Sequence, residues 1–375
     1  LCIGICTSTG SSRKRSETSK KRPCQESTRP NLLLRSRELK NTMQATLLSE
    51  ARPSPVVRSS DEGDTSTPRR KRNVGQPQQL ELVLADMVDV APKDDLASME
   101  IPLYSLSKNK DTETRVYQRG NRSVRIIPSG EGAATVFDKD LILYVASQLV
   151  ERMNRKLPVS PTVQIQTYDF IKATDRDDSR GGYENILGML RRLRGTTIET
   201  NIPTGGERQA DGFSLITNYS VISGKRSFNK KKGENVERVL SFTVTLSDWI
   251  YNGLLELEVL TLDRKYFQLG KAIERKLYEV ARKHCGTDKA MWEVGIDLLA
   301  EKIGFRRDRP KFRSELRAII KADTLPEYRM ALDQSRRPDM VVFYTRDAAA
   351  LSKHIRTQGC YDWFRALETK ETLTA

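Results

Sequence analysis

The chain has 375 residues, with 64 Lys and Arg against 49 Asp and Glu, so its formal net charge at pH 7 is +15. Such an excess favours a polyanionic partner, because each cation that faces a phosphate releases condensed counterions from nucleic acid. Apolar runs fall short of the roughly 20 residues of a membrane span, and five scattered cysteines favour neither a disulfide framework nor a four-ligand zinc site.

The N-terminal part of the chain carries much of that charge. Residues 1–78 hold 16 Lys and Arg but only 7 Asp and Glu. They are rich in Ser, Thr, Pro, Arg and Lys and have almost no apolar periodicity, so they cannot bury enough surface to offset ordering entropy. We predict that residues 1–90 form a disordered basic tail. Because the basic cluster follows the short apolar start, the order is not that of a signal peptide, and we expect a cytoplasmic protein.

A first globular pattern begins at about residue 95. Residues 117–127 have mixed strand character, and Asp138 stands as an N-cap before an amphipathic helix that runs to Met153. We predict a short helix over 168–173 and a third over 183–194, which Gly195 ends. Alternation predicts strands over 196–202, 213–222 and 238–246, with a basic polar loop between the last two.

The second half repeats this order. A strong helix is predicted over 268–284, a second over 295–303, and a third after Asp308, with Pro310 in its first turn. Strands follow over 328–332 and 340–344. Three helices and a β-hairpin are the order of a winged helix. We therefore expect an α+β fold with two tandem winged-helix domains, 95–262 and 263–350, and a C-terminal extension, 351–375.

The third helix of the second copy holds the sharpest candidate contact. Cations recur there every four residues beside an apolar stripe, a spacing that places them on one side for a major groove. The alternative is a solvated face with mutual repulsion. The predicted DNA-binding residues of this region are Arg306, Arg307, Arg309, Lys311, Arg313, Arg317 and Lys321.

Three further basic clusters are candidates for phosphate contacts. Those at the end of the first copy's third helix equally suit the C-terminal helix dipole, and those in the two hairpins are equally typical of solvent-exposed loops. The residues are Arg191, Arg192 and Arg194 in the helix, Lys225, Arg226 and Lys230 in the first hairpin, and Arg336 and Arg337 in the second.

Signatures of catalysis are weak. The two Gly-Lys pairs lack the upstream glycine of a phosphate loop, and His284 and His354 lie far apart for a metal site. His354, Arg356 and Tyr361 have only a faint similarity to a tyrosine recombinase. Asp175, Asp177 and Asp178 precede a helix, where carboxylates serve as caps. We expect no enzyme, no metal and no cofactor.

Several segments carry a family resemblance. Tyr266–Leu269 with Ile273–Gly286 resembles the hallmark helix of RepA-type plasmid replication initiators, and Tyr183–Leu193 and Phe242–Trp249 are also similar to that family. The resemblance covers about residues 95–350, in the same order, and leaves the N-terminal tail outside.

The resemblance implies tandem winged helices that bind repeated sites in double-stranded DNA at a plasmid origin. It also implies DNA opening with the host initiator ATPase, recruitment of the replicative helicase, and homodimers that repress the protein's own gene. The recognition helices would be 183–194 and 308–322. A transcriptional regulator that uses the same fold on a promoter is the alternative.

Overall fold

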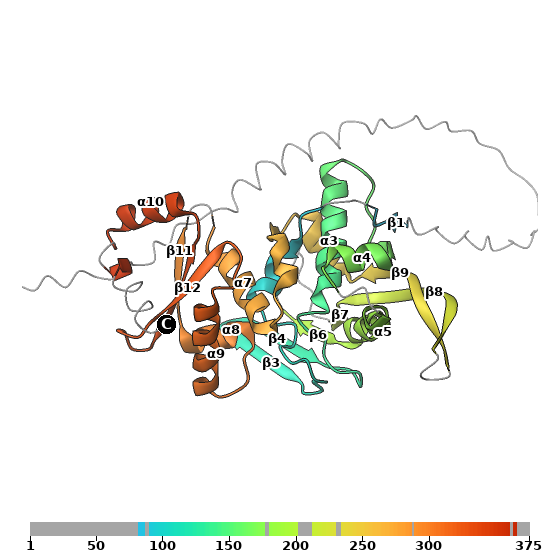
Figure 1. The fold of residues 1–375 in the computed structure, drawn as a ribbon, viewed down its shortest axis with the longest axis horizontal. Helices are drawn as coiled ribbons and strands as arrows, with labels where there is room; N and C mark the ends of the chain where they lie inside the picture. The colour runs from blue at the N-terminus through green and yellow to red at the C-terminus, as the bar shows by residue number, and fades with distance from the viewer. Residues whose placement is uncertain are drawn as a thin grey trace, which may run out of the picture. The chain divides into compact units, whose positions relative to one another are not determined.

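The computed structural model describes residues 82–86, 90–176, 180–201, 212–229, 234–286, 289–360 and 363–365. The predicted basic tail lies almost wholly outside these residues. They belong to one compact unit, which begins at Pro77, and they combine helices with sheets that are antiparallel except where β1 pairs with β5 (Figure 1).

The first half builds two four-stranded sheets beside its helices. One sheet has the order β1-β5-β9-β8 and the other β3-β4-β6-β7. Its helices are α2 (Leu96–Glu100), α3 (Lys139–Asn154), α4 (Thr167–Ala173), α5 (Arg180–Gly195) and α6 (Asp248–Leu255). Its strands are β1 (Val83–Leu84), β2 (Lys93–Asp95), β3 (Arg115–Arg119), β4 (Arg122–Ile127), β5 (Thr162–Gln166), β6 (Thr197–Thr200), β7 (Phe213–Ser214), β8 (Ile216–Asn229), β9 (Glu234–Leu246) and β10 (Val259–Thr261).

The second half is smaller and has one three-stranded antiparallel sheet of order β11-β13-β12. Its elements are the 3-10 helix η1 (Arg264–Gln268), α7 (Ala272–His284), β11 (Met291–Gly295), α8 (Ile296–Ile303), α9 (Arg309–Ala322), β12 (Tyr328–Asp333), β13 (Met340–Thr345) and α10 (Ala348–Gln358).

The two halves share one topology. The first runs α3-β5-α4-α5-β8-β9 and the second α7-β11-α8-α9-β12-β13, apart from two short strands, β6 and β7, between α5 and β8. In each, the strand after the first helix pairs antiparallel with the last strand of the hairpin, β5 with β9 and β11 with β13. The repeat therefore extends from element order to strand pairing.

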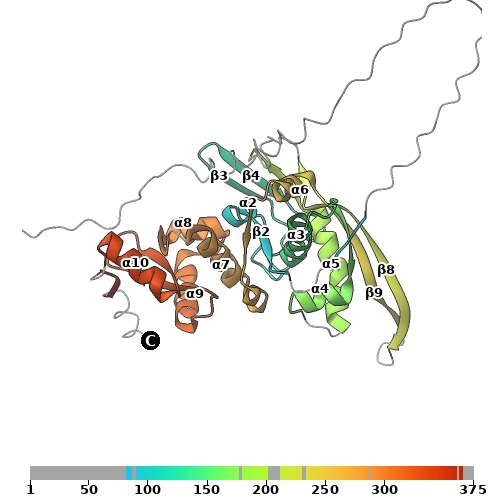
Figure 2. The ribbon, with the colours of Figure 1, turned by 90° about the horizontal axis from the view of Figure 1, so that it is seen from above.

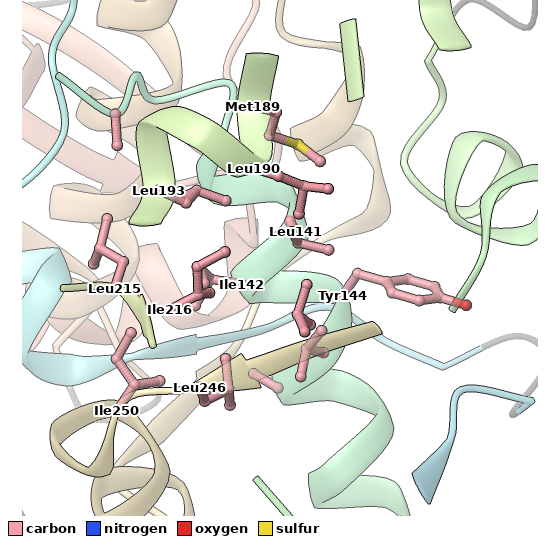
Figure 3. Close-up of a cluster of buried hydrophobic side chains, with 14 of the residues drawn as sticks. Leu141, Ile142, Tyr144, Met189, Leu190, Leu193, Leu215, Ile216, Leu246 and Ile250 are labelled. Atoms are coloured by element: carbon pink, nitrogen blue, oxygen red, sulfur yellow. The ribbon is translucent and has the colours of Figure 1, made fainter. Parts of the chain in front are cut away.

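Two apolar cores underlie the repeat. The larger joins the inward faces of α3 and α5 to β5 and β9, and Figure 3 shows Leu141, Leu190 and Leu246 meeting within it. The other packs α7, α8 and α9 against β12 and β13, around Tyr278, Phe312 and Phe343. Regular apolar spacing on each helix produces these faces, because residues three and four apart share one side.

The structure corrects one predicted helix start and one predicted helix cap. The helix expected from Gln268 begins at Ala272, because Lys271 is extended, while Asp263 accepts a hydrogen bond from the Lys265 amide and starts η1 instead. Asp138 does precede α3, but its carboxylate does not cap that helix. It accepts the Thr135 amide at 2.8 Å and binds an arginine of α5.

The β8–β9 hairpin is the longest strand pair and lies beside α5 (Figure 2). Its register shifts at three places, between Ile216 and Asn218, Ile222 and Ser223, and Gly224 and Ser227. On its other side β9 pairs with β5, so β8 is an edge strand of this sheet.

Candidate nucleic-acid interface

Helix α9 carries five of the predicted DNA contacts, Arg309, Lys311, Arg313, Arg317 and Lys321. Asp308 caps it by accepting the Lys311 amide at 2.8 Å, and Pro310 stands in its first turn, as predicted. Phe312, Leu316 and Ile319 are buried against the second core. With that side fixed, the opposite side of α9 faces solvent.

The four-residue stripe is not one uniform face. Four residues advance an α-helix by about 40°, so the stripe drifts from the rim of the buried side at Arg309 and Arg313 to the solvent side at Arg317 and Lys321. The small side chains Ser314 and Ala318 are also exposed on the solvent side. Such small residues would let a groove approach the helix axis closely.

Arg313 binds a buried carboxylate. Its guanidinium lies 3.1 Å from Asp339, whose side chain is only 3% exposed and also accepts a hydrogen bond from Arg337 at 3.0 Å. Buried charges need such partners, because desolvation otherwise costs several kcal/mol. Arg313 thus fastens α9 to the start of β13.

Three other predicted DNA contacts, in α9 or just before it, form ion pairs at the surface. Arg309 lies 3.0 Å from Asp297 of α8, and Arg307 lies 3.4 Å from Glu315. Arg306 pairs with Asp111 and Glu113 of the first repeat. Exposed pairs of this kind are worth at most about 1 kcal/mol, so a phosphate can compete for these arginines. Among the described residues, Arg317 and Lys311 have no ion-pair partner.

In the turn between β12 and β13, Arg336 forms ion pairs within the fold. Arg336 lies 2.7 Å from Glu293 and 2.9 Å from Asp333, and its guanidinium is 5.4 Å from the Trp363 ring centroid. Burial favours a higher pKa for Asp333, but hydrogen bonds from Ser335 and Trp363 outweigh it and lower that pKa. Arg337, although paired with Asp339, has a side chain that is 86% exposed.

In the first repeat, the three arginines of α5 that were predicted as contacts differ in the same way. Arg192 grips Asp138 with two hydrogen bonds, 2.8 Å and 2.7 Å long. Those bonds raise the pKa of Arg192. Arg191 and Arg194 are exposed, and neither pairs with a described residue.

The β8–β9 hairpin contains the remaining predicted contacts. Lys225 and Arg226 lie in β8, so they belong to the strand and not to the loop that the sequence predicted. Their side chains and all of Lys230 lie outside the described residues.

The described residues contain no group of three or more His, Cys, Asp or Glu placed to hold a metal. His284 stacks on Trp292, with ring centroids 4.0 Å apart, and burial lowers the pKa of His354. Tyr361, Asp177 and Asp178 are outside the described part of the chain. Among the described helices, none is long and apolar enough to cross a membrane.

The sequence gives no sign of a buried charge cluster between α3 and α7. Lys139 is fully buried and lies 2.7 Å from Asp94 and 2.9 Å from Glu279, which is also 2.9 Å from Lys276. Burial favours a higher pKa for Glu279, but the two lysines outweigh it and lower that pKa. These charges occupy positions that amphipathic spacing assigns to solvent, so only the structure reveals them.

The family model for replication initiator protein A matches residues 93–330, from β2 to β12. The chain belongs to the replication initiator protein A family. The match includes both α5 and α9, and it confirms the resemblance that the segments of α5, β9 and α7 indicated. Membership in this family supports a role in initiating DNA replication.

A relative of known sequence agrees with the family match. The chain is 32% identical over 270 residues to the "Putative replication protein" of Wigglesworthia glossinidia brevipalpis, covering 71% of this chain and 94% of the relative. Two crystal structures of RctB domains 2 and 3 are similar at 11% and 12% identity, with TM-scores of 0.48 and 0.46. They cover 66% and 67% of this chain and 95% and 97% of theirs.

Proposed function

We propose that this family member binds repeated sites in duplex DNA at a plasmid origin through two winged-helix domains, 95–262 and 263–350. The observation that carries the proposal is the shared topology, in which each half contains a helix, a strand, two more helices and a hairpin whose last strand pairs with that first strand. In a winged helix this arrangement presents the third helix to the major groove and the hairpin to the backbone.

The recognition helices in this proposal are α9 and α5. On α9, Arg317 and Lys321 read or position DNA from the solvent side, while Ser314 and Ala318 allow close approach. On α5, Arg191 and Arg194 fill the corresponding role. Arg313, Arg336 and Arg192 support the domains instead, because each binds a buried or partly buried carboxylate.

We propose the steps after binding by analogy with this family. Together with the host initiator ATPase, the bound protein would melt the DNA next to its binding sites. The replicative helicase would then be recruited. We propose that the chain does this without cutting DNA, as a monomer on repeats and a homodimer on its own promoter. Supercoiled origin DNA incubated with the protein and Mg²⁺ should stay unnicked, and replication of an origin plasmid without the gene should be restored in trans.

The central test replaces Arg317 and Lys321 with Ala, singly. Each lost base contact should weaken binding to the cognate repeat by about 1–3 kcal/mol, and a lost phosphate contact should reduce the salt slope by about one. Affinity is measured by fluorescence anisotropy at several salt concentrations.

The matched control is Arg155→Ala at the C-cap of α3, an exposed arginine whose ion pair is with Glu151 of that helix. Binding by this variant should equal that of the wild type. If both α9 variants also bind like the wild type, α9 is not the recognition helix.

A further inference from the structure

A pocket of about 680 Å³ lies at a junction of the two repeats. It is lined by residues between 105 and 115 of the first repeat, the start of α7, residues 304–307 between α8 and α9, and Glu315 of α9. Pockets of 300–1,000 Å³ suit small ligands. Nothing in the proposed DNA contacts of α9 and α5 uses this space.

The lining is strongly basic. Six cations face three carboxylates, and those carboxylates already have partners. Asp111 and Glu113 bind Arg306, and Glu315 binds Arg307. The remaining lining cations are Lys108, Lys110, Arg115 and Lys271, and Lys271 also lies 3.3 Å from Glu274 of its own helix.

Arg115, on β3, is the unusual member. The residue is only 5% exposed, yet no described carboxylate pairs with its guanidinium. One terminal nitrogen donates to the Leu103 carbonyl at 3.3 Å, and the Nε–H has no hydrogen-bond partner in the described part of the chain. Burying a guanidinium without a counter-charge costs desolvation free energy. An anionic group that enters this pocket would supply the missing counter-charge.

The start of α7 adds backbone donors. Lys271 is its N-cap residue and gives no side-chain cap, and Ala272 and Ile273 line the pocket. The first amides of an α-helix have no partner within the helix, and its dipole favours anions at that end. Beside them Gly270 faces open space.

We propose that this pocket binds a phosphate group, held by Arg115 and the α7 amides and attracted by Lys108, Lys110 and Lys271. The group belongs either to a free phosphate compound of mononucleotide size or to the DNA backbone. Both sources present the same chemistry, so the experiment must separate them.

The first arm titrates the full chain, without DNA, with inorganic pyrophosphate and with ATP in a calorimeter. The variants are Lys108→Ala with Lys110→Ala, Lys271→Ala, and Arg115→Met. Loss of one charge-assisted contact should weaken binding about tenfold or more. Lys353→Ala on α10, an exposed lysine outside the pocket, should bind like the wild type.

The second arm measures the salt dependence of duplex DNA binding with the same variants. If the phosphate is that of DNA, pyrophosphate binds weakly or not at all, and the salt slope falls by about one in Lys271→Ala and by about two in the double lysine variant. If the source is a free compound, the variants lose pyrophosphate and keep the wild-type salt slope.

The proposal is overturned if pyrophosphate binds but no variant changes its affinity. It is also overturned if pyrophosphate does not bind and the salt slopes of DNA binding are unchanged. Thermal unfolding checks that Arg115→Met is folded, and if it is not, the exposed lysine variants decide. The free-phosphate arm contains no DNA, so it can fail while the Arg317 test succeeds, and the reverse.

Discussion

Neighbouring arginines of this protein differ in what they bind, although the sequence presents them alike. On α5, Arg192 forms two hydrogen bonds with Asp138, which is buried, whereas Arg191 next to it is exposed and unpaired among the described residues. The helix turns by about 100° per residue, and that rotation decides which side chain reaches α3. Charge alone therefore identifies neither DNA contacts nor structural pairs.

Arg192→Met should lower the free energy of unfolding by about 1–3 kcal/mol, because it leaves the Asp138 carboxylate buried without its partner. Arg191→Met is the matched control and should leave stability unchanged. Urea unfolding measures both, and equal stability of the two variants would show that the pair with Asp138 contributes nothing.

The sequence predicted the cations of α9 but not that they have different partners and exposures. Arg309, Arg313, Arg317 and Lys321 share a four-residue spacing, and that spacing suggested a single face. The pair between Arg313 and Asp339 depends on where β13 begins in space, which no local pattern encodes.

At the scale of elements, the three-stranded sheet of the second repeat is covered on both faces. Met330, Val341 and Phe343 face the helical core, while Ala331, Val342 and Tyr344 pack against α10 and the residues after it. Figure 1 shows α10 on the side of β11 and β12 away from α9. The segment from Ala348 to Phe364 therefore packs onto the same sheet as the second repeat.

Phe364→Ala should destabilise the protein by about 3 kcal/mol, since it removes a buried ring that meets Tyr344 edge-on with centroids 5.1 Å apart. Thermal unfolding reports the change. The control is Lys353→Ala on α10, which should have the melting temperature of the wild type. A Phe364→Ala variant of unchanged stability would mean that Phe364 does not cover the sheet.

Periodicity located the long helices and the hairpin strands, but it missed β5 and β11. Both are five residues long and run directly into the following helix, β5 into α4 and β11 into α8. Without a turn residue between them, strand and helix look like one segment. These two strands complete the repeated sheet, so the sequence predicted the order of elements better than their pairing.

At the scale of the whole described unit, buried charges join the first helices of the two repeats. Lys139 of α3 reaches both Asp94 and Glu279, and Arg275 of α7 binds Asp140 of α3. Burial raises the pKa of Asp94 to about 7, against the attraction of Lys139 and with the repulsion of Glu279. Two carboxylates share one lysine, and the repulsion between them favours the protonated form of Asp94.

This proton gives a pH dependence of stability. The folded protein keeps it at pH values where the unfolded chain has lost it, so its stabilising effect is full below about pH 4 and disappears as the pH rises through about 7. The free energy of unfolding of the wild type relative to Asp94→Asn should therefore fall between pH 5 and pH 8.

Urea unfolding at several pH values measures that difference. Asp86→Asn replaces an exposed carboxylate and should follow the wild type at each pH. A difference between wild type and Asp94→Asn that is flat across this range would show that Asp94 is already ionised in the folded protein at pH 5.

The three register shifts in the β8–β9 hairpin bear on solubility. Strand β8 is 14 residues long and lies at the edge of its sheet, and the exposed Ile222 and Leu240 add apolar surface to the hairpin. A flat strand of that length would offer a template for another chain to extend the sheet. Bulges break the regular ladder and increase the local twist, so an intruding strand could match only short stretches of β8. The irregular register thus guards against edge-to-edge aggregation.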